Sequence, residues 1–261
     1  MIIDGKKIAK KILEEVKDKL QKSGKFLRLA AILVGGDPEL KKFVELKKKA
    51  AEEIGFDFKT YEFSENISND ELKKEVSKIV ETADGVIIEL PLPRHLNTQD
   101  LLNLIPGEKD VDVLSQKGQN DFYANRSKIL PPAVETVKQI FEEYKIDSRG
   151  KTAVLFGQGL LVGKPASHWL KNQGAIVSVI DEFTKDPAEI SKFSDIVISG
   201  VGKPGLISGD MVKDGATVID FGKDVDFENV SQKAGLITPP TGGVGPIVVV
   251  AVLKNLIELW S

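Results

Sequence analysis

The sequence contains no cysteine, which excludes disulfide bonds, thiolate zinc sites and cysteine nucleophiles. Only two histidines are present, His95 and His168, so a histidine-rich cluster is excluded as well and we expect no metal site. The longest apolar run, Ile247 to Leu253, is far too short to cross a bilayer. The first residues lack the apolar core of a secretory signal. We therefore expect a protein without a membrane segment, located in the cytoplasm.

Basic residues do not exceed acidic ones: 36 lysines and arginines stand against 39 aspartates and glutamates, for a formal net charge of −3. A protein that neutralises nucleic-acid phosphates needs a cationic excess on some surface. We therefore expect no nucleic-acid partner. The 261 residues suffice for one large domain or for two smaller ones with their own cores.

Helical and strand-like spacings of apolar residues alternate along the chain. The predicted helices cover residues 5–22, 37–55, 69–83, 131–145, 163–173 and 246–259. The predicted strands cover residues 29–34, 57–63, 85–90, 152–156, 175–180, 195–199 and 216–220. This alternation is typical of parallel α/β sheets, and two such series meet near residue 130. We predict two α/β domains around a cleft, the usual place for a small-molecule site.

A glycine-rich turn follows the predicted strand 152–156. Gly157, Gly159 and Gly163 have the spacing G-x-G-x-x-x-G, one residue longer than the usual dinucleotide fingerprint. Such glycines let the backbone approach a pyrophosphate, to which the next helix offers free N–H groups. Asp181 follows 24 residues after Gly157, where an acid binds the ribose of NAD and repels the 2′-phosphate of NADP. The alternative is a turn that serves packing alone.

A second glycine-rich turn, SGVGKPG from Ser199 to Gly205, also follows a predicted strand. Its residues Val201 and Gly202 would then contact the same cofactor. We predict that residues 131–245 form a Rossmann-type NAD(P)-binding domain. Residues 1–130 and 246–261 would form the other domain.

One face of the second predicted helix carries apolar residues at spacings of three and four: Leu40, Phe43, Ala50 or Ala51, and Ile54. Lys47 is the only charge on this face. A lysine drawn into a cleft can hold or move a proton during catalysis. The alternative is a solvated lysine whose stem lies along apolar surface.

Acidic residues follow the next strand. Glu89 closes an apolar run, and Asp110 and Asp112 lie in the segment KDVD. A carboxylate near Lys47 would fix its charge, and Asp112 could accept hydrogen bonds from a polar heterocycle. Isolated acids more often serve as surface caps or turns.

Seven segments, in this order, resemble the bifunctional methylenetetrahydrofolate dehydrogenase/methenyltetrahydrofolate cyclohydrolase family: IIDGKKIAKKILEEV, LAAILVGGDPELKKFVELKKKAAEEIG, ELPLPRHLN, EKDVD, GQGLLVGKP, VGKPGLI and ITPPTGGVGP. They cover nearly the whole chain, and VGKPG followed by GGVGP is highly specific. The resemblance implies oxidation of 5,10-methylenetetrahydrofolate by a nicotinamide cofactor. Hydrolysis of the methenyl product to 10-formyltetrahydrofolate would follow.

The resemblance also implies roles for single residues. Lys47 matches the catalytic lysine, and Asp112 matches the aspartate that holds the pterin. Gly242, Gly243 and Pro246 match a loop beside the substrate. The domain of residues 1–130 and 246–261 would bind folate and carry out catalysis. Tetrahydrofolate derivatives are then the expected partners, and a homodimer through the nucleotide domain is the expected assembly.

Several positions depart from the family in the substrate-binding half, among them Leu40 in place of a serine. Phe43 replaces a tyrosine, so ring stacking on the substrate can persist without the hydroxyl. Glu89 replaces the glutamine that orients the lysine, and its carboxylate would favour the charged form of Lys47. Val113 replaces the glycine of K-D-V-D-G. We expect Glu89, as part of the catalytic group, to hinder any step that needs a neutral lysine.

The nucleotide half departs as well. Gln158 and Gly159 replace an arginine and a serine. Loss of the arginine removes a phosphate partner, which agrees with Asp181 in favouring NAD over NADP. A single residue, Lys223, remains between the segments VIDFG and DVDFE.

The first interpretation is therefore the family enzyme, with one of its two activities weakened. A related oxidoreductase or hydrolase that acts on a modified folate is the second interpretation. A homologue that binds folate or nucleotide without catalysis is the third.

Overall fold

The computed structural model describes all 261 residues and contains two parallel β-sheets, one of three strands and one of five. This confirms the predicted α/β class. The chain divides into two compact units. The three-stranded unit comprises Lys10–Pro132 and Val249–Ser261, and the five-stranded unit comprises Met1–Ala9 and Ala133–Val248. No helix is long and apolar enough to cross a membrane.

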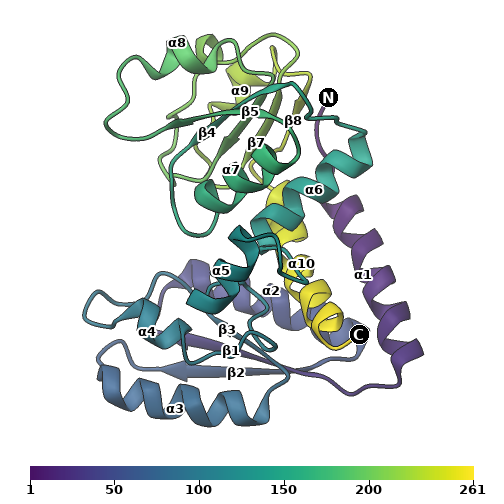
Figure 1. Ribbon diagram of the computed structural model, residues 1–261, viewed down its shortest axis with the longest axis vertical. Coiled ribbons are helices and arrows are strands. Elements are labelled where there is room, and N and C mark those ends of the chain that lie inside the picture. The colour runs from purple at the N-terminus through teal and green to yellow at the C-terminus, as the bar shows by residue number, and fades with distance from the viewer. The chain divides into compact units, whose positions relative to one another are not determined.

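The sheet of the three-stranded unit has the order β2-β1-β3. Its strands are β1 (Arg28–Val34), β2 (Asp57–Phe63) and β3 (Gly85–Ile88). Its helices are α2 (Pro38–Ile54), α3 (Asn69–Thr82), α4 (Thr98–Leu102) and α5 (Gln116–Tyr123). Both α2 and α3 pack against the sheet, with α3 below it in Figure 1. The central strand β1 is buried from Leu29 to Val34, which explains its continuous apolar sequence.

The sheet of the five-stranded unit has the order β5-β4-β6-β7-β8. Its strands are β4 (Thr152–Phe156), β5 (Ile176–Ile180), β6 (Ile196–Ser199), β7 (Thr217–Asp220) and β8 (Leu236–Ile237). Its helices are α6 (Pro132–Tyr144), α7 (Gly163–Asn172), α8 (Pro187–Ser191), the 3-10 helix η1 (Gly209–Met211) and α9 (Phe227–Val230). Because β5 and β6 flank β4 on opposite sides, the strand order reverses there, and ligands bind at such reversals in open α/β sheets.

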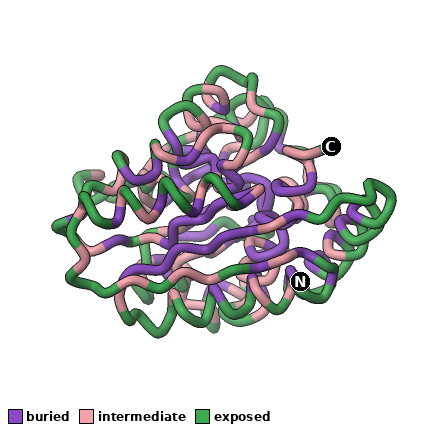
Figure 2. Tube along the Cα trace, turned by 90° about the horizontal axis from the view of Figure 1, so that it is seen from below, coloured by how far each residue is buried: buried purple, intermediate pink, exposed green.

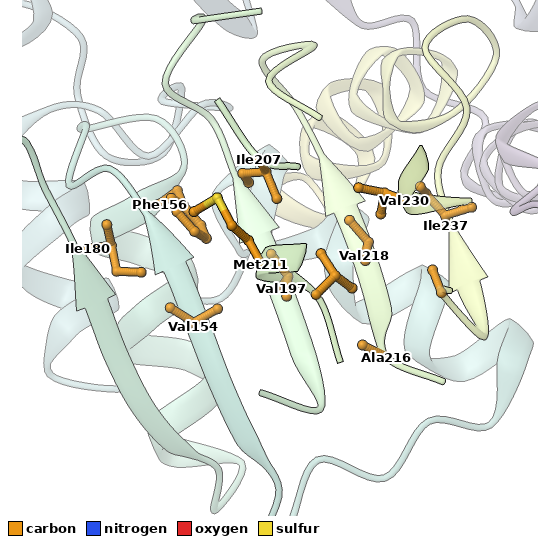
Figure 3. Close-up of a cluster of buried hydrophobic side chains, with 12 residues drawn as sticks. Val154, Phe156, Ile180, Val197, Ile207, Met211, Ala216, Val218, Val230 and Ile237 are labelled. Atoms are coloured by element: carbon orange, nitrogen blue, oxygen red, sulfur yellow. The ribbon is translucent and has the colours of Figure 1, made fainter. Parts of the chain in front are cut away.

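Side chains from all five strands of this sheet contribute to one apolar core (Figure 3). The fully enclosed members are Val154, Phe156, Ile180, Val197, Ile207, Met211, Val212, Ala216, Val218, Val230, Ala234 and Ile237. Figure 2 shows burial along the trace, with buried inner strands and helices whose outer turns are exposed. The core fixes where the carboxyl ends of β4, β6 and β7 emerge.

The N-terminal segment pairs with the edge strand β8. The Ile3 N–H donates to the carbonyl of Ile237 at 2.8 Å, and the Ile237 N–H donates to Met1 at 3.1 Å. Met1–Ala9 therefore belongs to the five-stranded unit, whereas the sequence analysis placed it with residues 1–130. The two-residue β8 is too short to produce a strand pattern, so its pairing was not foreseen.

Two long helices, α1 (Gly5–Ser23) and α10 (Val244–Leu259), contribute residues to both units. The later part of α10 is attached to the three-stranded unit by Asn255. Its buried side-chain amide donates to the carbonyls of Val111 and Leu130, each at 2.8 Å. These bonds join the C-terminal helix to the irregular segment that follows β3.

Replacing Asn255 by alanine removes both donors and leaves two largely enclosed carbonyl oxygens without partners. We expect the free energy of unfolding to fall by about 2–4 kcal/mol, because each lost buried partner costs about 1–2 kcal/mol. Urea unfolding followed by circular dichroism measures the change. The exposed Asn66→Ala is the matched control and should stay within about 0.5 kcal/mol of the parent. Equal losses in the two variants would contradict this role.

Candidate active site

Helix α2 presents Lys47 to the interior of the three-stranded unit. The helix starts where the Asp37 carboxylate accepts the N–H groups of Glu39 and Leu40, with Pro38 in the first turn. It ends at Gly55, whose φ of 100° is the left-handed conformation that glycine favours.

The buried face of α2 is rotated slightly from the predicted one. Its buried residues are Val44, Lys47, Ala51 and Ile54. Phe43 is 38% exposed, so it does not belong to the core stripe and its ring remains available to a ligand. The prediction that Lys47 is the single charge on the buried face is confirmed.

Lys47 and Glu89 form a buried ion pair. The Lys47 Nζ lies 2.6 Å from the Glu89 Oε1, and both residues are only 6% exposed. Glu89 directly follows β3, and its N–H still donates to the Ile32 carbonyl at 2.9 Å, so the sheet fixes its backbone. The predicted contact is therefore present. Removing either partner would leave an uncompensated buried charge.

Asp112 lies close enough to this pair for its charge to interact with both partners. Burial of the carboxyl group raises the pKa of Asp112 to about 7, although part of the residue remains exposed. Lys47 acts in the opposite direction, whereas Glu89 and Asp110 raise the pKa further. Asp112 consequently exchanges a proton near neutral pH, unlike an exposed aspartate.

The turn that carries Asp112 is organised by Asp110, which the sequence analysis noted without giving it a role. The buried Asp110 carboxylate accepts the N–H groups of Leu114 at 3.1 Å and Ser115 at 2.8 Å. Within this turn, Val113 has a φ of 59°, in the left-handed region that a β-branched residue rarely adopts. The backbone thus has a glycine conformation at the position where the family has glycine.

In the five-stranded unit, the turn between β4 and α7 requires two of its glycines. Gly157 has a φ of 88°, and its N–H donates to the Ile180 carbonyl at 2.8 Å. A β-carbon on Gly163 would lie 2.0 Å from the Gly157 carbonyl oxygen, so no side chain fits. At Gly159 a β-carbon would meet no atom within 4 Å. The Gln158 side chain donates to the Gly157 carbonyl within the turn itself.

The N-terminus of α7 has room for an anion. No side chain caps this helix, whose capping position is Val162. A helix dipole favours phosphate groups near the helix N-terminus, and Gly159 leaves the approach free of a side chain. The turn therefore fits the pyrophosphate of a dinucleotide.

Asp181 follows β5 directly, beside the glycine turn in the sheet. Its exposed carboxylate accepts the Phe183 N–H at 3.0 Å and the Thr184 hydroxyl at 2.8 Å. The Thr184 hydroxyl contributes most to lowering the pKa of Asp181, so the group is ionised at neutral pH. An anion consequently stands at the end of the second strand of this sheet.

The second glycine turn lies against the first. Val201 is 46% exposed, and Gly202 has a φ of 80°. A Val201 methyl carbon lies 3.1 Å from where a β-carbon of Gly157 would be. The two segments predicted to bind the cofactor are therefore in contact.

The GGVGP loop packs against the N-terminal segment, within the five-stranded unit. A β-carbon on Gly5 would lie 1.7 Å from the Gly243 carbonyl oxygen. Gly242 has a φ of 79°, and Gly243 has no room for a side chain because the Pro239 oxygen would lie 2.5 Å away. Pro246 follows in the first turns of α10.

One buried group beside the second glycine turn was not predicted from the sequence. It is Asp224, whose carboxylate accepts the Val201 N–H. No periodicity marks it, because it lies in a polar turn. No group of three or more histidine, cysteine, aspartate or glutamate side chains is placed to hold a metal ion.

Family models match most of the chain. The catalytic-domain model of tetrahydrofolate dehydrogenase/cyclohydrolase matches residues 3–112, and its NAD(P)-binding-domain model matches residues 131–261. The bifunctional protein FolD of Nautilia profundicola is 41% identical over an alignment that covers 98% of this chain and 96% of that protein.

Two solved structures have the same fold. The bifunctional FolD enzyme of Campylobacter jejuni is 36% identical with a TM-score of 0.93, covering 99% of this chain and 98% of that one. The FolD of Trypanosoma brucei, complexed with NADP cofactor and an inhibitor, is 31% identical with a TM-score of 0.95, covering 100% and 97%. Together with the two family models, these similarities show that the chain belongs to the tetrahydrofolate dehydrogenase/cyclohydrolase family.

Proposed function

We propose that this protein oxidises 5,10-methylenetetrahydrofolate to the methenyl form with a nicotinamide dinucleotide, and hydrolyses that product to 10-formyltetrahydrofolate. The observation that carries the proposal is the buried Lys47–Glu89 pair, whose lysine resembles the family's catalytic lysine in its sequence context. The relatives named as bifunctional enzymes support the same assignment. A chain that only bound folate would have no need to bury a charged lysine, given the free-energy cost of doing so.

The cofactor would be held by the five-stranded unit. Gly157 and Gly163 leave the backbone and the α7 N-terminus open to the pyrophosphate, while Val201 and Gly202 border the same turn. When bound, the nicotinamide supplies the acceptor for the hydride that the methylene carbon loses. The residues of the chain would bind the dinucleotide and the folate and orient them toward each other.

Lys47 would hold and move the proton in the hydrolytic step. Water adds to the methenyl carbon, one carbon–nitrogen bond of the ring opens, and a proton must leave the adding water. A lysine amine can accept this proton, but the Lys47 Nζ is already held 2.6 Å from the Glu89 carboxylate. We infer that hydrolysis is the weakened activity.

Asp112 would hold the pterin. The N–H donors of that heterocycle need an acceptor, and an ionised carboxylate offers two oxygens without a competing proton. With a pKa raised to about 7 by burial, the Asp112 carboxyl group is only partly ionised at neutral pH. Phe43, exposed on the same unit, would provide the stacking surface.

NAD would be preferred over NADP. The ionised Asp181 stands at the end of β5, where an acid accepts the ribose hydroxyls and repels a 2′-phosphate. Gln158 offers no positive charge in compensation, and its side chain bonds within its own turn.

The assembly would be a homodimer through the five-stranded unit. Its edge strand β5 carries Ile176, which is 63% exposed, and leads to Phe183, which is 81% exposed. An uncovered edge with apolar side chains is suited to pairing with a second copy of the same strand.

Glu89→Gln should increase methenyltetrahydrofolate hydrolysis at neutral pH, because the Lys47 amine is then no longer held by a carboxylate. Lys47→Ala should lower hydrolysis at least about 100-fold while some hydride transfer remains. The decay of methenyl absorbance measures hydrolysis, and its appearance with NAD or NADP measures oxidation.

The exposed Lys49→Ala and Glu53→Gln are the matched controls. The double variant Lys47→Met/Glu89→Gln removes both buried charges and separates a folding defect from a catalytic one. If Lys47→Ala hydrolyses as fast as the parent, Lys47 is not the proton carrier. A parent that neither oxidises nor hydrolyses these folates would refute the proposed function.

Asp181→Ser should narrow the preference for NAD, because serine keeps a hydroxyl acceptor for the Phe183 N–H but removes the negative charge. We expect the ratio of KM for NADP to KM for NAD to fall about tenfold, which corresponds to about 1.4 kcal/mol. The neighbouring Glu182→Gln is the control and should leave the ratio nearly unchanged. Tighter binding of NADP than NAD by the parent would contradict the assignment.

The KM for the folate substrate should fall as pH rises through about 7. Below this value the Asp112 carboxyl group is protonated, and above it the group is ionised and accepts pterin N–H donors. Initial rates between pH 6 and pH 8 at saturating cofactor give the profile. Asp112→Asn should raise KM and flatten the profile, whereas the exposed Asp70→Asn should reproduce the parent. A pH-independent KM in the parent would exclude this titration.

A further inference from the structure

A fully buried carboxylate lies under the second glycine turn of the five-stranded unit. Asp224 follows β7 and has no exposed surface. Its Oδ2 accepts the Ser199 hydroxyl at 2.5 Å and the Val201 N–H at 2.8 Å, and its Oδ1 accepts the Lys203 N–H at 2.5 Å. All three donors belong to the second glycine turn, whose first residue, Ser199, ends β6.

A second aspartate aims this carboxylate. Asp220, the last residue of β7, accepts the N–H groups of Gly222 at 2.9 Å, Asp224 at 3.1 Å and Val225 at 3.0 Å. Lys223 between them has a φ of 58°. These bonds fix the backbone of the tight turn between VIDFG and DVDFE. The Asp224 side chain therefore points into the interior of the unit.

The glycines around Asp224 show how closely these backbones approach. A β-carbon on Gly222 would lie 2.4 Å from the Asp224 Oδ2 and 2.6 Å from the Gly202 nitrogen. A β-carbon on Gly200 would lie 2.8 Å from the Val162 Cβ, at the start of α7. A shift of residues 199–203 would therefore disturb the first glycine turn as well.

A carboxylate in a protein interior is costly unless donors satisfy it. Here the donors come from a single turn, so the interaction fixes that turn rather than joining distant parts of the core. The three hydrogen bonds occupy both oxygens of Asp224, so the carboxylate does not need to contact a ligand directly. Its effect on a ligand would pass through Val201 and Gly202.

We propose that Asp224 is a positioning residue for the dinucleotide, because it holds the backbone from Val201 to Lys203 in the conformation that binds the cofactor. The inference rests on the proposed function, in which this turn contacts NAD or NADP. Asp224→Asn keeps the size of the side chain but points an amide at N–H donors, so the turn loses at least one bond to a charged acceptor.

Isothermal titration of the full-length protein with NAD, NADP and tetrahydrofolate provides the test, without turnover. We expect Asp224→Asn to weaken binding of the preferred dinucleotide about 10- to 100-fold, the equivalent of one bond to a charged group. Tetrahydrofolate binding should stay unchanged. Hydrogen exchange of the Val201 and Lys203 amides should accelerate in the same variant.

Asp226→Asn is the matched control, since Asp226 lies in the same segment but caps α9 through Asn229. It should leave dinucleotide binding unchanged. If Asp224→Asn does not fold, Ser199→Ala removes one bond and should weaken binding by a smaller factor with faster exchange at Val201.

A parent that binds neither dinucleotide refutes the proposed function and, with it, this inference. A parent that binds, together with an Asp224→Asn or Ser199→Ala variant of equal affinity, overturns the inference alone. Equal weakening by Asp224→Asn and Asp226→Asn would show a general loss of stability and overturn it too.

Discussion

The Lys47–Glu89 ion pair connects α2 to the end of β3, and the burial of both side chains depends on this contact. Neither charge could remain 6% exposed without the other. The Asp37 cap sets where the helix begins, and the continued β1–β3 ladder fixes the backbone of Glu89. The helix start and the strand pairing together bring the Lys47 amine and the Glu89 carboxylate into contact.

Burial is the main reason why Asp112 holds a proton near neutral pH, and the negative charges of Glu89 and Asp110 add to this effect. Lys47 acts in the opposite direction, but it is bonded to Glu89, and Asp110 is satisfied by two backbone N–H groups. An uncharged residue at position 89 would remove one of these repulsions. A change next to Lys47, the proposed proton carrier, thus affects the group proposed to bind the pterin through charge alone.

Sequence periodicity located the strands 57–63 and 152–156 to the residue, because both pair in register along their whole length. The Lys47–Glu89 contact was foreseen from the family resemblance, in which the residue at position 89 orients the lysine. Short elements were not foreseeable: α4 and α5 depend on single caps, Asn97 and Ser115, and not on an apolar repeat. Buried polar turns escape for a related reason. Asp224 has the local sequence of a solvated turn, and only tertiary hydrogen bonds reveal its burial.

The departures from the family act on different physical levels. Val113 occupies the left-handed region at a cost of about 1–2 kcal/mol, and the Asp110 bonds to Leu114 and Ser115 hold the turn nonetheless. The backbone at position 113 therefore keeps a glycine-like conformation although the residue is valine. Gly159 is the opposite case, because neither its φ nor its surroundings demand glycine. Substitution there alters only what a bound phosphate would meet. The fold constrains the turn that carries Asp112 strongly and position 159 weakly, so the residue proposed to face the cofactor can change without a change in the scaffold.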